Sequence, residues 1–411
     1  MLRTINHYSL IAFGCLVIGV LGGFLTGHRV GFSEASDRTR LLPNGPVRCN
    51  PGPWGELIYT PFSIAAPDDI LPIESIEQQG TRWFLAGYTA DRFVSFLQGT
   101  SMTPEQQQQF LAPGVMQIRP DGIELTPSPD LVFALPEDAR GKIYQSLAQS
   151  TENESQVNYL AKEDLKEQFA NAGLSEETMM LFNKLCFERG DYLMFSGVAA
   201  LLAHIPTFDE KVHFAKALTR QRTMVLNLHL TPGTDIDALE QYWDRGCWGT
   251  DVRTIFRSMA AIPGGTWMNI LMILPDLPSS EIYDYPIAVD NPLVGPPVNR
   301  DCAWTALNFF QETPNNNFGK MDYVRQELDT NYVRLDGSPR YGDLVLIARP
   351  DGFLVHAAIY IADDIWFTKN GSNMVHPWML SKSDDVLKQF EFQINPDQHL
   401  TVAYYRDKRI Q

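Results

Sequence analysis

The chain has few cysteines and few positive charges for its length, and both shortages exclude classes of protein. Five of its 411 residues are cysteine, with no CxxC pair and no Cys/His cluster of zinc type, so we expect neither a disulfide scaffold nor a metal site. We also expect no cofactor. The 33 Lys and Arg residues against 49 Asp and Glu give a formal charge of −16. So acidic a protein lacks the basic face that nucleic acids require, and a polybasic patch for anionic lipid is equally missing. The cysteines are Cys15, Cys49, Cys186, Cys247 and Cys302.

An uncharged stretch near the N-terminus is long enough to cross a bilayer. It covers the 20 residues Tyr8 to Gly27, and a helix of that length spans the hydrocarbon core. A secretory signal has a shorter apolar run and a clear cleavage site, so residues 1–30 predict a transmembrane anchor rather than a cleaved signal. We expect a single-pass membrane protein whose bulk is extracytoplasmic, although the flanking arginines leave the orientation undecided.

Three glycines within this stretch recur every four residues. They are Gly19, Gly23 and Gly27, and such a face lets two membrane helices pack closely. Dimerisation through them is one interpretation. The commoner explanation is that glycine is simply frequent in membrane helices.

The rest of the chain divides by composition. Residues 31–75 predict a Pro-rich linker with extended pieces, because the prolines exclude a long helix. Residues 76–285 predict a mainly helical domain in which no motif reveals a role. Its helices are expected at 138–149, 161–172, 175–188, 192–205, 209–220 and 234–245, and another begins at Thr103-Pro104. The histidines of this region share no ligand spacing and are most simply core or surface residues: His204, His213 and His229.

Residues 286–411 predict a smaller α+β domain. Ala303, Leu307 and Phe310 share a face, which indicates a helix that starts at about Asp301 with Cys302 in its first turn. A thiol there meets the positive end of the helix dipole, which lowers its pKa. A neighbouring imidazole would complete its activation as a nucleophile.

Three short strands follow, and the second carries a histidine. They are expected at 344–347, 353–361 and 365–370, and His356, His376 and His399 are the histidines downstream of Cys302. A three-residue loop at 362–364 places residue 370 opposite 356, so that Asn370 orients the ring of His356. Thr368 is the diagonal alternative, and a two-residue loop would bring Gly371 there instead. We expect His376 and His399 to be structural or surface residues.

These pieces resemble one family in their order. Asp301-Cys302 at a helix start, Gly342-Asp343-Leu344-Val345 entering a strand, and His356-Ala357-Ala358-Ile359-Tyr360-Ile361 are similar to the NlpC-type papain-like cysteine peptidases. The resemblance covers residues 285–411. It implies a helix bearing Cys302 packed on a small antiparallel sheet, with His356 as general base and then acid and Asn370 as the third residue.

The sequence departs from the family at two points. The Ser-Gly that usually follows Asp-Cys is replaced by Ala303-Trp304, and the Tyr-x-x-Gly-Gly segment before the cysteine is absent. Tyr285 is therefore the candidate for the tyrosine that helps bind the oxyanion. We expect Trp366 to be a packing ring and Lys369 an exposed charge.

Taken together, the sequence predicts a membrane-anchored, thiol-dependent hydrolase of amide bonds, with no nucleic-acid partner. By resemblance the substrate is a cell-envelope peptide. One alternative is an acyltransferase with the same fold, which would move lipid acyl groups through a Cys ester. The third alternative is a catalytically inactive, membrane-anchored binding protein.

Overall fold

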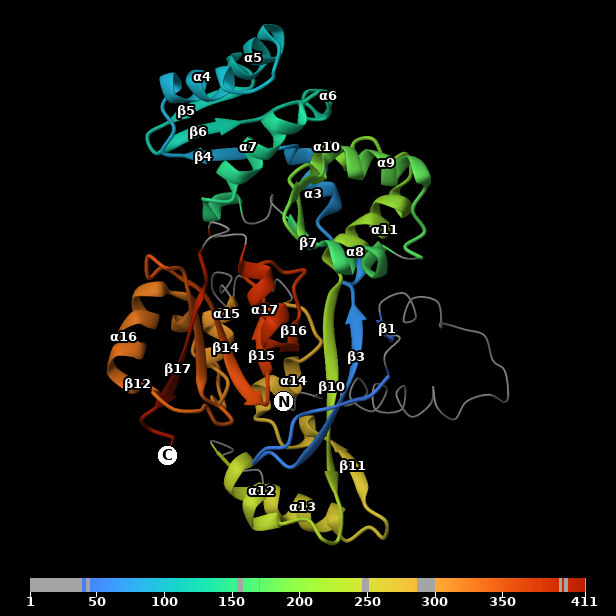
Figure 1. Ribbon diagram of the computed structural model, residues 1–411, viewed down its shortest axis with the longest axis vertical. Helices are drawn as coiled ribbons and strands as arrows, with labels where there is room; N and C mark the ends of the chain where they lie inside the picture. Colours follow the sequence, from blue (N-terminus) through green and yellow to red (C-terminus); the bar gives the residue numbers. More distant parts are fainter. Residues whose placement is uncertain are drawn as a thin grey trace, which may run out of the picture. The chain divides into compact units, whose positions relative to one another are not determined.

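The computed structural model describes residues 39–41, 45–153, 158–169, 171–245, 251–286, 300–391, 394 and 398–410. In these residues the protein has a mixed α+β fold with small antiparallel sheets (Figure 1). The predicted anchor in residues 1–30, with Gly19, Gly23 and Gly27, lies outside them. Within the described ranges, no helix has both the length and the apolar character needed to cross a bilayer. The chain from Thr39 onward forms one compact unit.

The segment predicted as a linker contributes a strand to a five-stranded antiparallel sheet. This strand, β3 (Glu56–Ile64), pairs along its whole length with β10 (Gln221–Leu230). Its other edge is shared by two short strands, which pair with residues 62–64 and 58–59 and leave Pro61 unpaired on that side of the described sheet. A proline is tolerated at such a position because no ladder hydrogen bond is lost. The remaining strands are β1 (Thr39–Leu41), β2 (Val47–Arg48) and β11 (Thr266–Asn269).

The region after β3 is rich in helix, as predicted, but it also holds two three-stranded sheets, ordered β4-β6-β5 and β7-β9-β8. Their strands are β4 (Trp83–Ala86), β5 (Met116–Arg119), β6 (Gly122–Leu125), β7 (Asn158–Ala161), β8 (Phe187–Arg189) and β9 (Tyr192–Phe195). The helices are α3 (Ile73–Gln79), α4 (Ala90–Gln98), α5 (Pro104–Leu111), α6 (Pro129–Phe133), α7 (Glu137–Leu147), α8 (Lys162–Phe169), α9 (Glu176–Leu185), α10 (Val198–Leu202) and α11 (Phe208–Thr219), with the 3-10 turns η1 (Asp68–Ile70) and η2 (Thr151–Asn153).

Capping residues predicted the start of a helix correctly, whereas a long apolar run led to a wrong prediction of secondary structure. Helix α5 begins at Pro104 as predicted, with a capping box between Thr103 and Gln106. The prediction of one core helix over 192–205 is wrong. Its first residues form β9, the middle strand of its sheet, and α10 begins only after Gly197. A buried central strand is as uniformly apolar as a buried helix, so composition alone does not separate them.

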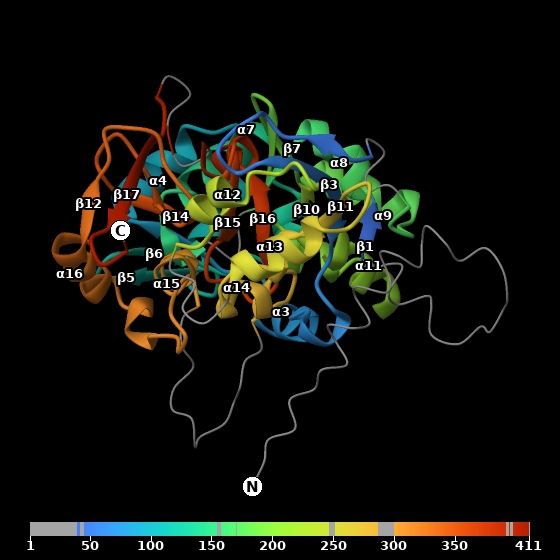
Figure 2. The ribbon, with the colours of Figure 1, turned by 90° about the horizontal axis from the view of Figure 1, so that it is seen from below.

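The C-terminal part is a six-stranded antiparallel sheet in the order β12-β17-β13-β14-β15-β16. Helix α15 packs against β14 and β15 (Figures 1 and 2), and α17 packs beside β16 (Figure 1). The strands are β12 (Tyr332–Arg334), β13 (Leu344–Ala348), β14 (Leu354–Ala362), β15 (Ile365–Lys369), β16 (Trp378–Lys382) and β17 (Thr401–Asp407). The helices here and before the sheet are α12 (Ile236–Trp243), α13 (Val252–Ala260), α14 (Asp276–Glu281), α15 (Cys302–Leu307), α16 (Met321–Asn331) and α17 (Ser383–Phe390), with η3 (Ile270–Met272) and η4 (Asn316–Gly319).

The β14–β15 hairpin has the predicted register. Ile359 pairs with Phe367 and Tyr360 with Trp366, which is the offset that places residue 356 opposite 370. A bulge at the turn then brings Ala362 opposite Ile365. Away from the turn, the described ladder ends at the pair Ile359–Phe367, although both strands continue beyond it. The two strands therefore part on the side of the hairpin where His356 lies.

The two faces of the six-stranded sheet belong to different cores. On one face, Ala357, Ile359 and Ile361 of β14 join the residues of α15 and of the α12–α13 region in what we call the inner core. On the other face, Ala358 and Tyr360 join Val386 of α17 in the outer core. Side chains of a strand alternate between its faces, so α15 and α17 cover opposite faces of β14.

A buried carboxylate fixes the start of β13. Asp343 is 1% exposed, and its oxygens accept hydrogen bonds from Nε and Nη2 of Arg406 at 2.9 and 2.6 Å. The N–H of Arg340 donates to the same carboxylate at 2.7 Å, and Nη1 of Arg245 lies 3.5 Å away. The Gly-Asp pair noticed in the sequence is therefore a structural anchor, which ties the loop before β13 to β17 and to the end of α12.

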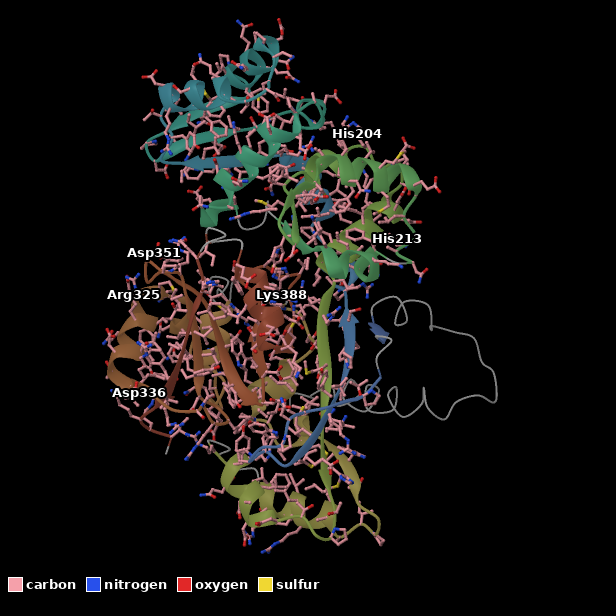
Figure 3. All side chains as sticks on the ribbon, viewed as in Figure 1. His204, His213, Arg325, Asp336, Asp351 and Lys388 are labelled. Atoms are coloured by element: carbon pink, nitrogen blue, oxygen red, sulfur yellow. The ribbon has the colours of Figure 1, made fainter. Side chains whose placement is uncertain are left out.

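We predict that Asp343→Asn lowers the free energy of unfolding by about 3 kcal/mol, because it leaves the guanidinium groups around it without their counter-charge. Urea unfolding measures the change. The matched control is Asp351→Asn, at the exposed turn between β13 and β14 (Figure 3), which we expect to unfold close to wild type. Equal stability of the two variants would contradict the anchoring role.

Candidate active site

Helix α15 presents Cys302 at its first position, as the sequence predicts. Asp301 is the N-cap, and its Oδ1 accepts a hydrogen bond from the N–H of Trp304 at 2.9 Å. The residues after Cys302 are buried in the inner core, where Nε1 of Trp378 in β16 donates to Oγ1 of Thr305 at 3.0 Å. The helix is therefore held against the sheet by packing, with its N-terminus at the place where β14 and β15 part.

The Cys302 thiol is half-buried, and its pKa is raised to about 12. Burial is the main cause, and the carboxylate of Asp301 adds to it. The N–H of Ala357, the positive charge of Lys369 and the N–H of Ala303 act in the opposite direction. The expectation of a lowered pKa is therefore wrong for the resting protein, because desolvation outweighs the end of a six-residue helix. At neutral pH the thiol is protonated.

His356 is buried in β14 with one ring nitrogen anchored. Its side chain is 1% exposed, Nε2 lies 2.6 Å from Oγ1 of Thr368, and the ring stacks on Phe390 with centroids 4.5 Å apart. No described residue hydrogen-bonds to Nδ1. Burial, followed by the charge of Lys369, lowers the pKa to about 3, so the ring is neutral at pH 7. When the proton of the ring lies on Nε2 and is donated to Thr368, Nδ1 carries a lone pair and can act as a base.

The two groups lie at neighbouring positions without being bonded to each other. The sulfur faces the N–H of Ala357, the residue after His356. Because side chains alternate along a strand, the imidazole of His356 lies on the same face of β14 as Ala358 and Tyr360, and α17 covers that face. In the described part of the chain, no hydrogen bond joins Cys302 to His356.

The other predicted site residues lie elsewhere. Asn370 donates from Nδ2 to Gln389 of α17, so Thr368, the diagonal alternative, is the residue that contacts His356. The ring of Tyr285 is buried in a third group of side chains, with residues such as Phe62 and Trp83, whereas Cys302 borders the inner core.

Lys369 was missed by the sequence prediction. It was expected to be an exposed charge, but the side chain is 0% exposed, and Nζ donates to the carbonyl oxygens of Gly371 and Asn373 at 2.8 and 3.0 Å. Alternation along β15 carried the signal, because Phe367 and Ile365, two and four residues earlier, are core residues. Trp366 is a buried packing ring, as predicted.

The remaining histidines have ordinary surroundings. Nδ1 of His204 lies 2.9 Å from the carbonyl oxygen of Ala200, and both His204 and His213 belong to the helix-rich region (Figure 3). His376 bonds to the carbonyl oxygen of Asn370, and its pKa is lowered to about 4, chiefly by burial. Among the residues that the structure describes, no group of three or more His, Cys, Asp or Glu side chains is arranged to hold a metal ion.

Comparison with known proteins identifies no relative: no protein-family model, no curated protein and no solved structure matches this chain. The assignment of a function therefore depends on the geometry of the site.

We predict that the buried, neutral His356 makes the protein sensitive to acid. The unfolded imidazole takes up a proton below about pH 6.5, but the folded one only below about pH 3. Between these values the unfolded state binds more protons, so stability is present above pH 6.5 and is lost as the pH falls.

The test compares urea unfolding of the wild type and His356→Gln at pH 7.5 and pH 5. We expect the wild type to lose about 2 kcal/mol more than the variant over this interval, at roughly 1.4 kcal/mol per pH unit below 6.5. His376 and the carboxylates titrate in both proteins and cancel in the difference. Parallel pH dependences would show that His356 is not held neutral by burial.

Proposed function

We propose that residues 286–411 form a papain-like thiol hydrolase domain that cleaves amide bonds, with Cys302 as nucleophile and His356 as general base. One observation carries the proposal. The buried, neutral imidazole is anchored at Nε2 by Thr368 while Nδ1 has no described partner, and the next peptide N–H faces the sulfur of Cys302. A cysteine at a helix start, packed on an antiparallel sheet that supplies the histidine, also supports the resemblance noted in the sequence.

In the proposed reaction the sulfur attacks the acyl carbon as its proton passes to Nδ1 of His356. The carbon–nitrogen bond then breaks, and the imidazolium returns the proton to the leaving amine. Water, deprotonated by the same nitrogen, attacks the thioester, releases the acid and restores the thiol. The N–H of Cys302 at the start of α15 is the proposed donor to the oxyanion.

The resting pair is neutral in this mechanism. The pKa of the thiol is about 12 and that of the imidazole about 3, so a thiolate–imidazolium ion pair is not the stable resting form. Proton transfer then accompanies attack instead of preceding it. Cys302 and His356 lie on opposite faces of β14 in the resting structure, so the proposed proton transfer requires the sulfur and the imidazole to be brought together when substrate binds.

The proposal includes the setting of the reaction. An anchor in residues 1–30 would hold the domain at a membrane, with the bulk of the chain outside the cytoplasm and a cell-envelope peptide as substrate. The uncharged stretch from Tyr8 to Gly27 supports this setting.

A second candidate function is that of a catalytically inactive binding protein. Two observations favour it: no hydrogen bond joins Cys302 to His356 in the described residues, and burial keeps the thiol protonated. It predicts an inert Cys302, so one measurement separates the two candidates.

That measurement is the rate of alkylation by iodoacetamide at pH 7, with each labelled cysteine located by peptide mapping. Cys49 and Cys186 are internal controls, since burial raises the pKa of each thiol to about 12, as it does for Cys302. We expect Cys302 to react at least about tenfold faster than either control, and the advantage to disappear in His356→Ala. Labelling of Cys302 at the rate of the controls would exclude the hydrolase and leave the binding protein.

Thr368 gives a second test of the pair. We predict that Thr368→Val, which keeps the shape and removes the hydroxyl, slows labelling of Cys302 by about tenfold, because the imidazole loses the contact that fixes its tautomer. Thr368→Ser retains the hydroxyl and should label as the wild type does. Equal rates in all three proteins would mean that Thr368 has no part in activating the thiol.

A further inference from the structure

Lys369 is a buried cation on the face of the sheet that carries α15. In β15 it alternates with Phe367, which lies in the inner core with the residues of α15. Its neighbour across the ladder on one side is Trp378, whose indole donates to Thr305 of α15. On the other side the ladder stops at Ile359–Phe367, and its register, if continued, leads from Lys369 toward Ala357, whose N–H faces Cys302. Lys369 is thus paired on one side with a residue that bonds to α15, and on the other it lies beyond the point where the two strands part.

The surroundings of Lys369 show two roles for its ammonium group. Its donors bind the carbonyl oxygens of Gly371 and Asn373, which closes the loop after β15 into a turn around the ammonium. Its charge acts on groups from separate elements: Asp301 and Cys302 of the α15 N-terminus, His356 of β14 and His376 of the loop. Asp301 and Lys369 both act on the sulfur, and their effects are opposite in sign.

We propose that Lys369 is a positioning residue of the active site, which fixes the loop 370–376 beside the reactive centre and supplies the positive charge that stabilises the sulfur of Cys302 as it becomes anionic. The inference rests on the proposed function, since Cys302 is the group that Lys369 serves.

A buried ammonium is costly unless it is bonded and its charge is offset. Two carbonyl oxygens accept hydrogen bonds from the ammonium group, and its charge lowers the pKa of Asp301 at the start of α15, against the effect of burial. That same carboxylate opposes ionisation of the neighbouring thiol. Without Lys369 the effect of Asp301 on the sulfur would lose this positive charge as its counterweight, and the negative charge that attack requires would form beside another carboxylate.

The test is the pH profile of iodoacetamide labelling at Cys302 in the full-length protein, for wild type, Lys369→Met and Lys369→Arg. The control is Lys216→Met, which removes the charge of another buried lysine, one paired with Asp68. We expect Lys369→Met to slow labelling of Cys302 about tenfold at pH 7 and to move the profile up by about one pH unit. Lys369→Arg should restore most of the rate, and Lys216→Met should leave the profile unchanged.

The outcomes separate this inference from the proposed function. An unshifted profile in Lys369→Met, or faster labelling because the loop has merely opened, would overturn the role of Lys369 even if His356→Ala abolishes the reactivity of Cys302. Conversely, a shifted profile in Lys369→Met together with no effect of His356→Ala would support the charge effect and reject the hydrolase. The rates at Cys49 and Cys186 report in the same samples whether a variant has lost its fold.

Discussion

The packing of α15 against β14 and β15 is the contact on which the candidate site depends. A helix of six residues is not stable by itself in water, because nucleation costs more than so few hydrogen bonds return. Burial of Trp304 and its neighbours in the inner core supplies the missing free energy, and the Asp301 cap satisfies an N–H that would otherwise be bare. Cys302 is thereby brought to the N–H of Ala357, at the point where the ladder between β14 and β15 stops.

Burial also decides the electrostatics of the site. Removal from water disfavours every charged form, so the thiol keeps its proton and the imidazole stays without a second one. A helix N-terminus next to a histidine is commonly associated with a thiolate, yet desolvation is the larger effect at Cys302. In the proposed reaction, charge on the sulfur and the imidazole would therefore form only transiently, and fixed groups would have to stabilise it.

Much of this architecture could be predicted from signals carried by neighbouring residues. The elements that could not be predicted depend on contacts between distant parts of the chain. The start of α15, the β14–β15 register and the burial of Trp366 follow from capping, turn length and alternation, which are properties of a few adjacent residues. The strand β3 within a Pro-rich stretch does not, because its stability comes from pairing with β10, more than 150 residues away. The same limit applies to β9, whose central position in a sheet is a tertiary property.

The pKa of Cys302 and the burial of Lys369 needed the tertiary structure for a related reason. Each depends on how much water the surrounding elements exclude, and sequence patterns report the direction of a side chain but not the depth at which it ends. Once that depth is known, the two are linked. The charge of Lys369, at zero exposure, lowers the pKa of Asp301 against the effect of burial, and the residue next to Asp301 is the cysteine. Lys369, the capping carboxylate of Asp301 and the thiol of Cys302 are thus electrostatically coupled. Removing the charge of one changes the free energy of ionising the others.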